Sequence, residues 1–229
     1  MLSTLKSTLR GSLRRLGYDV VGYQPDRAPD WWRQSATFAP LWQEIEALTL
    51  VPPERCFALH QMARHAQRVA GDFAEVGVYR GGTARLLART APDKRLHLFD
   101  TFAGMPAVDA AIDWHKAGDF ADTSADGVRR ALADCANVAL HPGLFPDTAG
   151  PVAGTGFALV HVDVDIYSSA MAALEFFYPR LAAGGVMAFD DYARAKTRGI
   201  AEALDRFLAG KREALVTFAS HQAAFIKLG

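Results

Sequence analysis

Three aspartates lie near the ends of two apolar runs, and their type and spacing indicate a metal site. Asp163 lies near the end of FALVHVDVD (157–165), and Asp190 and Asp191 end VMAFDD (186–191). If the runs are neighbouring parallel strands, both sets of acids reach the same edge of the sheet. Three like charges together are costly unless a cation compensates them, and carboxylate oxygens suit Mg²⁺ or Mn²⁺. We expect these aspartates to bind such an ion; the alternative is a turn or helix cap.

A glycine-rich turn, EVGVYRGGT (75–83), follows an earlier apolar run. Glycines let a ligand approach the main chain, and the start of the next helix offers N–H groups to an anion. The spacing departs from the GxGxxG pattern of dinucleotide sites. Glu75 would repel a diphosphate but suits an ammonium group. The turn therefore favours the methionine end of S-adenosylmethionine over NAD; the alternative is a tight strand–helix connection.

Asp100 ends the next apolar run, RLHLFD (95–100). An acid at this distance beyond a glycine turn commonly binds the two hydroxyls of a ribose. A carboxylate can accept both hydrogen bonds. NAD and S-adenosylmethionine share that ribose, so Asp100 indicates a nucleoside cofactor without choosing between them; the alternative is a solvated strand end.

The elements that must position these residues alternate between helices and short buried strands. We expect helices over 55–69, 82–91, 125–134, 168–182 and 198–209, a long loop over 103–124, and strands over 72–77, 95–100, 138–141, 157–165 and 186–191. Two last runs, 214–219 and 222–228, are expected to pair antiparallel at the sheet edge. This pattern predicts an α/β fold: a Rossmann-like, doubly wound, mostly parallel seven-stranded sheet with helices on both faces.

Residues 1–50 are expected to form a helical and loop appendage to a domain over 51–229. Leucines recur at helical spacing with basic residues between them (Leu2, Leu5, Leu9, Leu13 and Leu16; Lys6, Arg10, Arg14 and Arg15). This amphipathic basic helix favours packing on the domain or on a second subunit, with a membrane surface as the alternative. We therefore expect a homo-oligomer.

The composition excludes several classes of protein. Lys plus Arg and Asp plus Glu both number 25, so no positive field favours nucleic acid. The two cysteines, Cys56 and Cys135, lie outside any CxxC pattern, which argues against a disulfide framework and favours the cytoplasm. No apolar run approaches the roughly 18–20 residues of a transmembrane helix.

Seven stretches together resemble the macrocin O-methyltransferase (TylF-like) family, which methylates sugar hydroxyls of natural products. They are TLVPPERCFAL (49–59), GDFAEVGVYRGGTA (71–84), LFDTFAGMP (98–106), GDFADTS (118–124), GLFPDT (143–148), HVDVDIYSS (161–169) and YPRLAAGGVMAFDDYA (178–193). They keep a consistent order from 49 to about 205. The resemblance implies a class I methyltransferase fold, S-adenosylmethionine, Mg²⁺ and a small-molecule hydroxyl acceptor. The two ends of the chain match poorly, so the resemblance does not identify that acceptor.

Position by position, the resemblance implies the following roles. Asp163, Asp190 and Asp191 are similar to metal ligands. The expected cofactor contacts are Glu75, Gly77, Gly81 and Gly82 around the methionine part, Asp100, Thr101 and Phe102 at the ribose, Ser124, Gly143 and Leu144 at the adenine, and Thr49 and Leu50 as a covering pair. Tyr79 and Thr83 complete this set, with aromatic packing as the alternative for Tyr79. Family members usually have Trp where Leu144 stands and Thr-Met where Thr49-Leu50 stand.

Two residues are candidates for the catalytic base. Asp165 follows the proposed ligand Asp163 by two residues and points to the opposite face if the strand persists. His115 lies in the long loop, where the family also has a histidine, and an imidazole suits proton transfer near neutral pH. His161, on an apolar strand, is expected to be a core residue.

Three other functions fit parts of the pattern. Asp163-Val164-Asp165 reads as the DxD motif of metal-dependent glycosyltransferases, although Glu75 in the glycine turn does not suit a nucleotide diphosphate. An NAD-dependent oxidoreductase lacks support without GxGxxG. A non-catalytic cofactor-binding domain is the third alternative, and the presence of all three metal-type acids argues against it.

Overall fold

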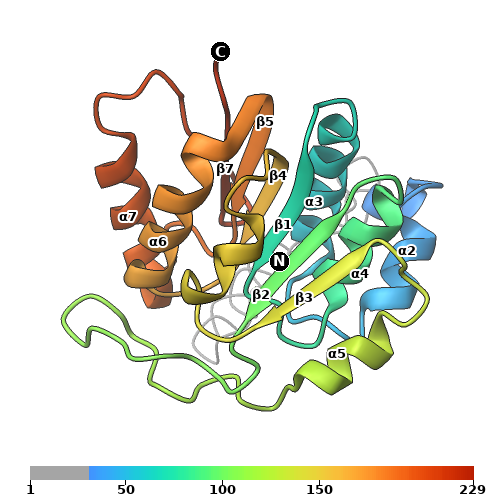
Figure 1. Ribbon diagram of the computed structural model, residues 1–229, viewed down its shortest axis with the longest axis horizontal. Helices are drawn as coiled ribbons and strands as arrows, with labels where there is room; N and C mark the ends of the chain where they lie inside the picture. The colour runs from blue at the N-terminus through green and yellow to red at the C-terminus, as the bar shows by residue number, and fades with distance from the viewer. Residues whose placement is uncertain (1–30) are drawn as a thin grey trace, which may run out of the picture.

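Seven strands form one sheet at the centre of the computed structural model, which describes residues 31–229 (Figure 1). The spatial order is β3-β2-β1-β4-β5-β7-β6. The strands are β1 (Asp72–Val76), β2 (Leu96–Asp100), β3 (Val138–Pro142), β4 (Phe157–Val162), β5 (Leu181–Phe189), β6 (Val216–Phe218) and β7 (Gln222–Ile226). β1 to β5 pair in parallel, whereas β7 runs antiparallel to β5 and to β6. The expected mostly parallel α/β sheet and its antiparallel edge are confirmed.

Helices cover both faces of this sheet. They are α2 (Ala39–Ile45), α3 (Pro53–Ala66), α4 (Gly82–Thr90), α5 (Ala125–Ala131), α6 (Tyr167–Phe177) and α7 (Arg198–Leu208), with 3₁₀ turns η2 (Trp31–Gln34), η3 (Asp147–Val152), η4 (Tyr178–Arg180) and η5 (Ala195–Thr197). The α2, α3 and α4 helices lie on the other side of the strands from α6 and α7 (Figure 1).

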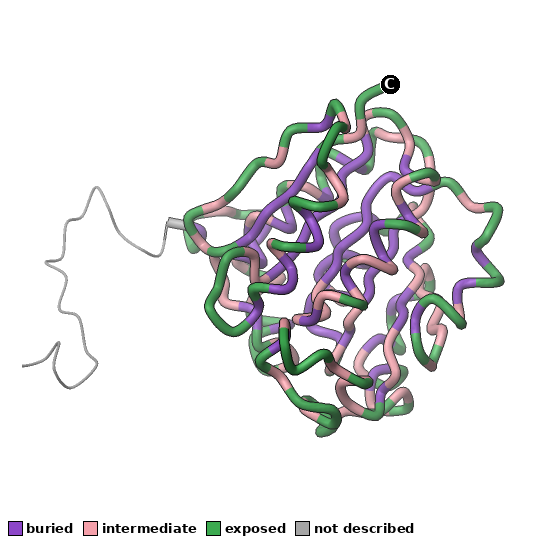
Figure 2. The backbone as a smooth tube through the Cα atoms, turned by 90° about the vertical axis from the view of Figure 1, so that its left-hand side faces the viewer, coloured by how far each residue is buried: buried purple, intermediate pink, exposed green. Residues whose placement is uncertain are grey.

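The core follows the two-residue period of the strands. Phe73 and Leu159, which pair across β1 and β4, pack in the cluster under α3 and α4, whereas their neighbours Ala74 and Val160 pack under α6. β4 is buried at every position, as a central parallel strand requires (Figure 2). β1 and β4 are therefore packed between two hydrophobic clusters, which fix the positions of the residues at the ends of these strands.

Several predicted boundaries are wrong. The strand expected over 186–191 runs from Leu181 to Phe189, so Asp190 and Asp191 follow it instead of ending it. β4 ends at Val162 instead of 165, because the chain turns there and Asp165 takes a left-handed conformation (φ 60°). The helix expected to run to 182 ends at Phe177, and Pro179 sits in a 3₁₀ turn, since proline cannot continue a helix. Gly184 (φ 80°) lies inside β5 and does not end the helix.

The described part of the expected N-terminal appendage packs on the domain. Trp32, Phe38 and Ile45 are buried in the same cluster as α3 and α4, and the Phe38 ring lies 5.1 Å from that of Phe57. The predicted basic helix with its leucines lies outside the described residues. The division at residue 50 stays a prediction. Within residues 31–229, no helix combines the length and the apolar character needed to cross a bilayer.

His60 in α3 predicts a pH-dependent stability. The side chain is buried between Thr37 and Thr90, and burial, together with the charge of Arg64, lowers its pKa to about 4. In the unfolded chain the histidine has a pKa near 6.5, so between pH 6.5 and pH 4 the unfolded state binds a proton that the folded state does not. The free energy of unfolding therefore falls as the pH drops from 6.5 towards 4. We expect His60→Gln to reduce this loss by about 2–3 kcal/mol.

Urea unfolding at pH 7 and pH 4.5 measures the effect. His65→Gln is the matched control, because His65 is an exposed residue of the same helix. Equal pH dependence in His60→Gln and wild type would show that this imidazole is not responsible.

Candidate active site

A cavity of about 330 Å³ opens beyond the carboxyl ends of β1, β2, β4 and β5. Residues from the ends of these strands line it, together with residues 48–51, the long loop and the turn before α7. Of the predicted site residues, it is lined by Thr49, Leu50, Gly77, Tyr79, Thr83, Asp100, Thr101, His115, Gly143, Leu144, Asp163, Asp165, Asp190 and Asp191. The structure thus brings the glycine turn and the acidic strand ends to one cavity.

Four aspartates form an acidic rim on one side of this cavity (Asp163, Asp165, Asp190 and Asp191). Val162 pairs with Phe189 across β4 and β5, which places the residues that follow them side by side. Carboxylate oxygens of Asp163, Asp165 and Asp191 all lie within 4.8 Å of one another. An all-oxygen set of this kind fits a hard divalent cation such as Mg²⁺.

Burial and mutual repulsion govern the ionisation of the rim. Burial raises the pKa of Asp163 well above its usual value, and the nearby charge of Asp190 adds to the rise. Burial and the charge of Asp191 raise the pKa of Asp165 to about 7. Although burial opposes it, hydrogen bonding from Arg194 and the charge of Arg55 lower the pKa of Asp191. Burial also raises the pKa of Asp190. Three of the four acids thus resist ionisation, which a cation would reverse.

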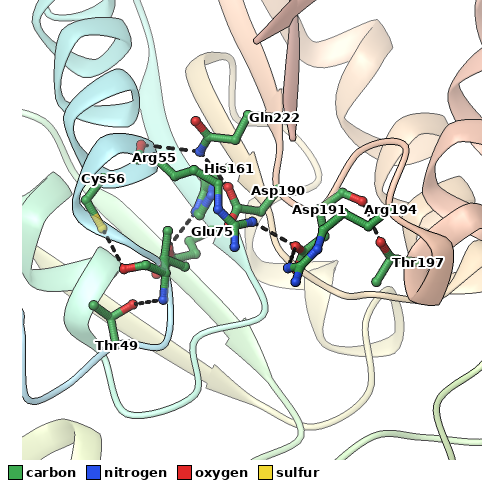
Figure 3. A network of polar contacts seen from close by, with 11 residues as sticks. Thr49, Arg55, Cys56, Glu75, His161, Asp190, Asp191, Arg194, Thr197 and Gln222 are labelled. Carbon is green, nitrogen blue, oxygen red and sulfur yellow. Dashed lines mark hydrogen bonds and ion pairs between the residues drawn. The ribbon is translucent and has the colours of Figure 1, made fainter. Parts of the chain in front are cut away.

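Asp190 is turned towards protein partners. Its Oδ2 accepts a hydrogen bond from Arg55 Nη1 at 2.8 Å, and its Oδ1 accepts one from Gln222 Nε2 at 2.5 Å (Figure 3). Asp165, in contrast, joins Asp163 and Asp191 because the chain has left the strand after Val162. The structure therefore brings Asp165 into the group of convergent carboxylates and places Asp190 beside it.

The turn after β1 depends on glycine at residue 77. Gly77 has φ 88°, and a Cβ atom there would lie 1.8 Å from the carbonyl oxygen of Asp163. Asp100 fixes the turn: its carboxylate accepts hydrogen bonds from the backbone N–H groups of Val78 (2.7 Å), Tyr79 (3.0 Å) and Phe102 (2.8 Å). Asp100 both shapes the turn and lines the cavity, so it is available to a hydroxylated ligand.

Glu75 lies beneath the cavity and does not line it. Its side chain is fully buried, and Oε1 is 2.8 Å from Nδ1 of His161, which is fully buried too (Figure 3). Sequence reasoning expected Glu75 to contact an ammonium group directly. The two strands β1 and β4 are paired at these residues, so Glu75 faces His161 across the sheet.

Four other predicted cofactor contacts also lie outside the cavity lining. Gly82 packs against the preceding segment: its N–H donates to Leu48 O at 3.2 Å, and a Cβ atom would lie 2.6 Å from Thr49 Cβ. Gly81 (φ 87°) faces α5, Phe102 packs in the core, and the Ser124 hydroxyl caps α5. These residues shape the walls of the site from behind.

The long loop after β2 places His115 at the cavity. Its Nδ1 lies 3.1 Å from Asp119 Oδ2, a contact that orients the ring. Asp113 anchors this loop by accepting a hydrogen bond from Tyr167 N at 3.0 Å, at the start of α6. The exposed Trp114 ring lies beneath Lys196, whose Nζ is 4.1 Å from the ring centroid.

Sequence reasoning missed Arg55, Arg194 and Lys196, which all line the cavity. Arg55 was visible as a lone arginine in TLVPPERCFAL, just before residues that become buried in α3. Lone arginines are usually solvated, so the residue type alone gave no reason to place it at the acids.

Comparison with known proteins supports one family. A family model described as Macrocin-O-methyltransferase (TylF) matches residues 27–215. The chain is 38% identical over 146 residues to the 8-demethyl-8-(2,3-dimethoxy-alpha-L-rhamnosyl)-tetracenomycin-C 4'-O-methyltransferase of Streptomyces olivaceus, which covers 56% of this chain and 55% of that protein. It is 32% identical over 166 residues to the mycinamicin III 3''-O-methyltransferase of Micromonospora griseorubida, which covers 64% and 65%.

A solved structure gives the same result for the fold. The structure of the O-methyltransferase NovP superimposes with a TM-score of 0.71 and 26% identity, over 80% of this chain and 83% of that chain. The chain spans less than two thirds of the length of the two curated relatives named above, 55% and 65%.

Proposed function

The chain belongs to the macrocin O-methyltransferase (TylF) family, and on that premise we propose that it transfers a methyl group from S-adenosylmethionine to a hydroxyl of a small molecule, a sugar or natural product, with a divalent metal ion. One observation carries the proposal. A single cavity touches both the glycine turn at Gly77–Tyr79 and the acidic rim. A methyl donor and a metal-held hydroxyl must lie next to each other, and this arrangement supplies both places.

The residues present fit the cofactor. Gly77 permits the tight turn, Asp100 offers carboxylate oxygens for ribose hydroxyls, and residues 48–51 line the same cavity. Gly143 and Leu144 form the wall proposed for the adenine, where the exposed Leu144 replaces an aromatic residue usual in the family. These elements would hold the cofactor and keep water from its reactive end.

Asp163, Asp190 and Asp191 are the proposed metal ligands. Each carboxylate oxygen has two lone pairs, so the bonds from Arg55 and Gln222 leave Asp190 able to bind a cation. The metal would supply a Lewis acid that lowers the pKa of the acceptor hydroxyl. Asp165 would then accept the hydroxyl proton at a carboxylate oxygen, with His115 as the alternative base.

Gly82 gives a test of the proposed cofactor side. Gly82→Ala would place a Cβ atom 2.6 Å from Thr49 Cβ and 2.8 Å from the Leu48 carbonyl carbon, so residues 48–49 must move away. We expect S-adenosylhomocysteine to bind about tenfold more weakly, as a loss of roughly 1.4 kcal/mol. Calorimetric titration measures the affinity. Gly154→Ala is the control, because open space surrounds that glycine; equal losses in both variants would contradict the role of Gly82.

Trp114 and Lys196 give a test of the proposed acceptor side. Trp114 is 57% exposed beside the cavity, and an exposed aromatic ring offers a face to a sugar or a flat natural product. We expect Trp114→Ala to raise the KM for the acceptor about tenfold, as a loss of roughly 1.4 kcal/mol, without changing the affinity for S-adenosylhomocysteine. Steady-state kinetics and titration together measure this. If Trp114→Ala changes only the affinity for S-adenosylhomocysteine, the ring acts on the cofactor side of the site, and its proposed role at the acceptor is wrong.

Two measurements test the proposed function itself. S-adenosylhomocysteine should raise the melting temperature, whereas UDP should not; the reverse result would favour a metal-dependent glycosyltransferase. A screen of hydroxylated sugars and natural products, with and without Mg²⁺, should then reveal methylated products by mass spectrometry. Methyl transfer that persists in full after treatment with a chelator would contradict the metal.

A further inference from the structure

One short stretch of chain joins the two halves of the site. Leu48 O accepts a hydrogen bond from Gly82 N at the start of α4, and residues 48–51, the covering segment, line the cavity. The segment leads through Pro52 directly into α3. In the first turn of α3, Arg55 reaches the acidic rim. The same stretch thus touches the glycine turn at one end and the rim at the other.

Arg55 holds two rim acids with one nitrogen. Its Nη1 lies 2.8 Å from Asp190 Oδ2 and 2.8 Å from Asp191 Oδ1, and its side chain is 8% exposed (Figure 3). Gln222 completes the arrangement: its Nε2 donates to Arg55 O at 3.3 Å and to Asp190 Oδ1. Buried charge-assisted bonds of this kind fix the separation and orientation of the two carboxylates.

The stretch between the two contacts is stiff. Val51 N donates to Thr49 Oγ1 at 3.0 Å, and Cys56 Sγ donates to Val51 O at 3.5 Å. Pro52 and Pro53 restrict the backbone between them. We therefore expect a displacement of the covering segment at the glycine turn to move the first turn of α3 and Arg55 with it.

The net charge of the rim allows a cation to bind beside Arg55. Among the described residues, Asp190 and Asp191 both pair with Arg55, and Asp191 also pairs with Arg194, so two of the four rim aspartates make ion pairs and two arginines face the rim. Two negative charges stay unmatched when all four acids are ionised, which equals the charge of one divalent ion. Arg55, Arg194 and one divalent metal ion can thus neutralise the rim together.

From these contacts we infer that Arg55 is a positioning residue that couples the two binding sites: the covering segment, once packed over the cofactor, holds Asp190 and Asp191 through Arg55 in the arrangement that binds the cation. This inference rests on the proposed function. Because coupling of binding free energies is reciprocal, the metal raises the affinity for the cofactor by the same factor as the cofactor raises the affinity for the metal.

Binding measurements on the full chain test the coupling without activity. The affinity for S-adenosylhomocysteine is titrated with and without Mn²⁺, and the affinity for Mn²⁺ is measured by electron paramagnetic resonance with and without S-adenosylhomocysteine. In the wild type we expect each ligand to raise the affinity for the other about tenfold, within the usual range of coupling. In Arg55→Gln we expect the coupling factor to fall to about one, because the variant loses the ion pairs with Asp190 and Asp191 but keeps the other residues of both binding sites.

Two further variants sharpen the test. Arg55→Lys keeps a cation in place and should retain part of the coupling, whereas Arg64→Gln, an exposed residue of the same helix, should retain all of it. Wild-type coupling in Arg55→Gln would overturn the inference. So would independent binding of both ligands to the wild type, an outcome that needs no variant and leaves the proposed function standing. Failure of S-adenosylhomocysteine to bind would overturn the proposed function and the inference together.

Discussion

Asp163→Asn is expected to lower methyl transfer by about a thousandfold, which corresponds to roughly 4 kcal/mol of transition-state stabilisation. Asp163 contributes an oxygen to the convergent carboxylates, and burial and the repulsion of nearby acids raise its pKa and that of Asp165. Replacing its carboxylate by an amide removes a charge that attracts the cation but keeps the shape of the side chain. Affinity for S-adenosylhomocysteine measured without metal should change little, because the proposed cofactor site lies at the glycine-turn end of the cavity.

The measurement compares the initial rate of methyl transfer at saturating Mg²⁺ with the calorimetric affinity for S-adenosylhomocysteine in the absence of metal. Asp93→Asn, an exposed aspartate between α4 and β2, serves as the matched control. Asp93→Asn should keep the wild-type rate. If Asp163→Asn also keeps the wild-type rate, the rim does not hold the metal.

Asp165→Asn is expected to lower kcat by at least about a hundredfold, because the amide cannot accept the proton of the acceptor hydroxyl. The carboxylate lies among the rim oxygens, where burial and Asp191 raise its pKa to about 7. His115→Gln is expected to lower kcat by less than about tenfold. Its ring is held by Asp119 and packs beside Trp114 and Phe120 in the long loop, which favours a role in shaping the acceptor side.

Rates measured with both variants at saturating acceptor, cofactor and Mg²⁺ separate the two candidates. Cofactor titration of each variant serves as the control for a folded site. If His115→Gln loses far more activity than Asp165→Asn, the imidazole is the base and the loop supplies it.

Local patterns predicted the sheet well because each strand carries its own signal. FALVHV is apolar throughout, which indicates a strand buried on both faces, and RLHLFD ends in an acid at the expected edge. The meeting of the glycine turn with the acidic strand ends followed from the expected parallel sheet, since parallel strands end at one edge. These inferences needed no knowledge of side-chain partners.

Most of the misplaced residues depend on partners far away in the chain. Glu75 was expected at the cavity, but His161 on the neighbouring strand faces it, and no pattern within either strand encodes that pair. Gly82 was expected to make room for a ligand, but the room serves Leu48 and Thr49. Arg55 was overlooked because its partners, Asp190 and Asp191, follow β5 and lie far from it in the sequence. Register and burial, which only the fold supplies, decide such roles.

A crystal grown with S-adenosylhomocysteine and Mn²⁺ tests the central claim most directly, because Mn²⁺ gives an anomalous signal. The account predicts S-adenosylhomocysteine in the cavity beside Gly77 and Asp100, and an anomalous peak among Asp163, Asp190 and Asp191. An anomalous map without a peak at these aspartates, in a crystal whose cavity holds no S-adenosylhomocysteine, would contradict it.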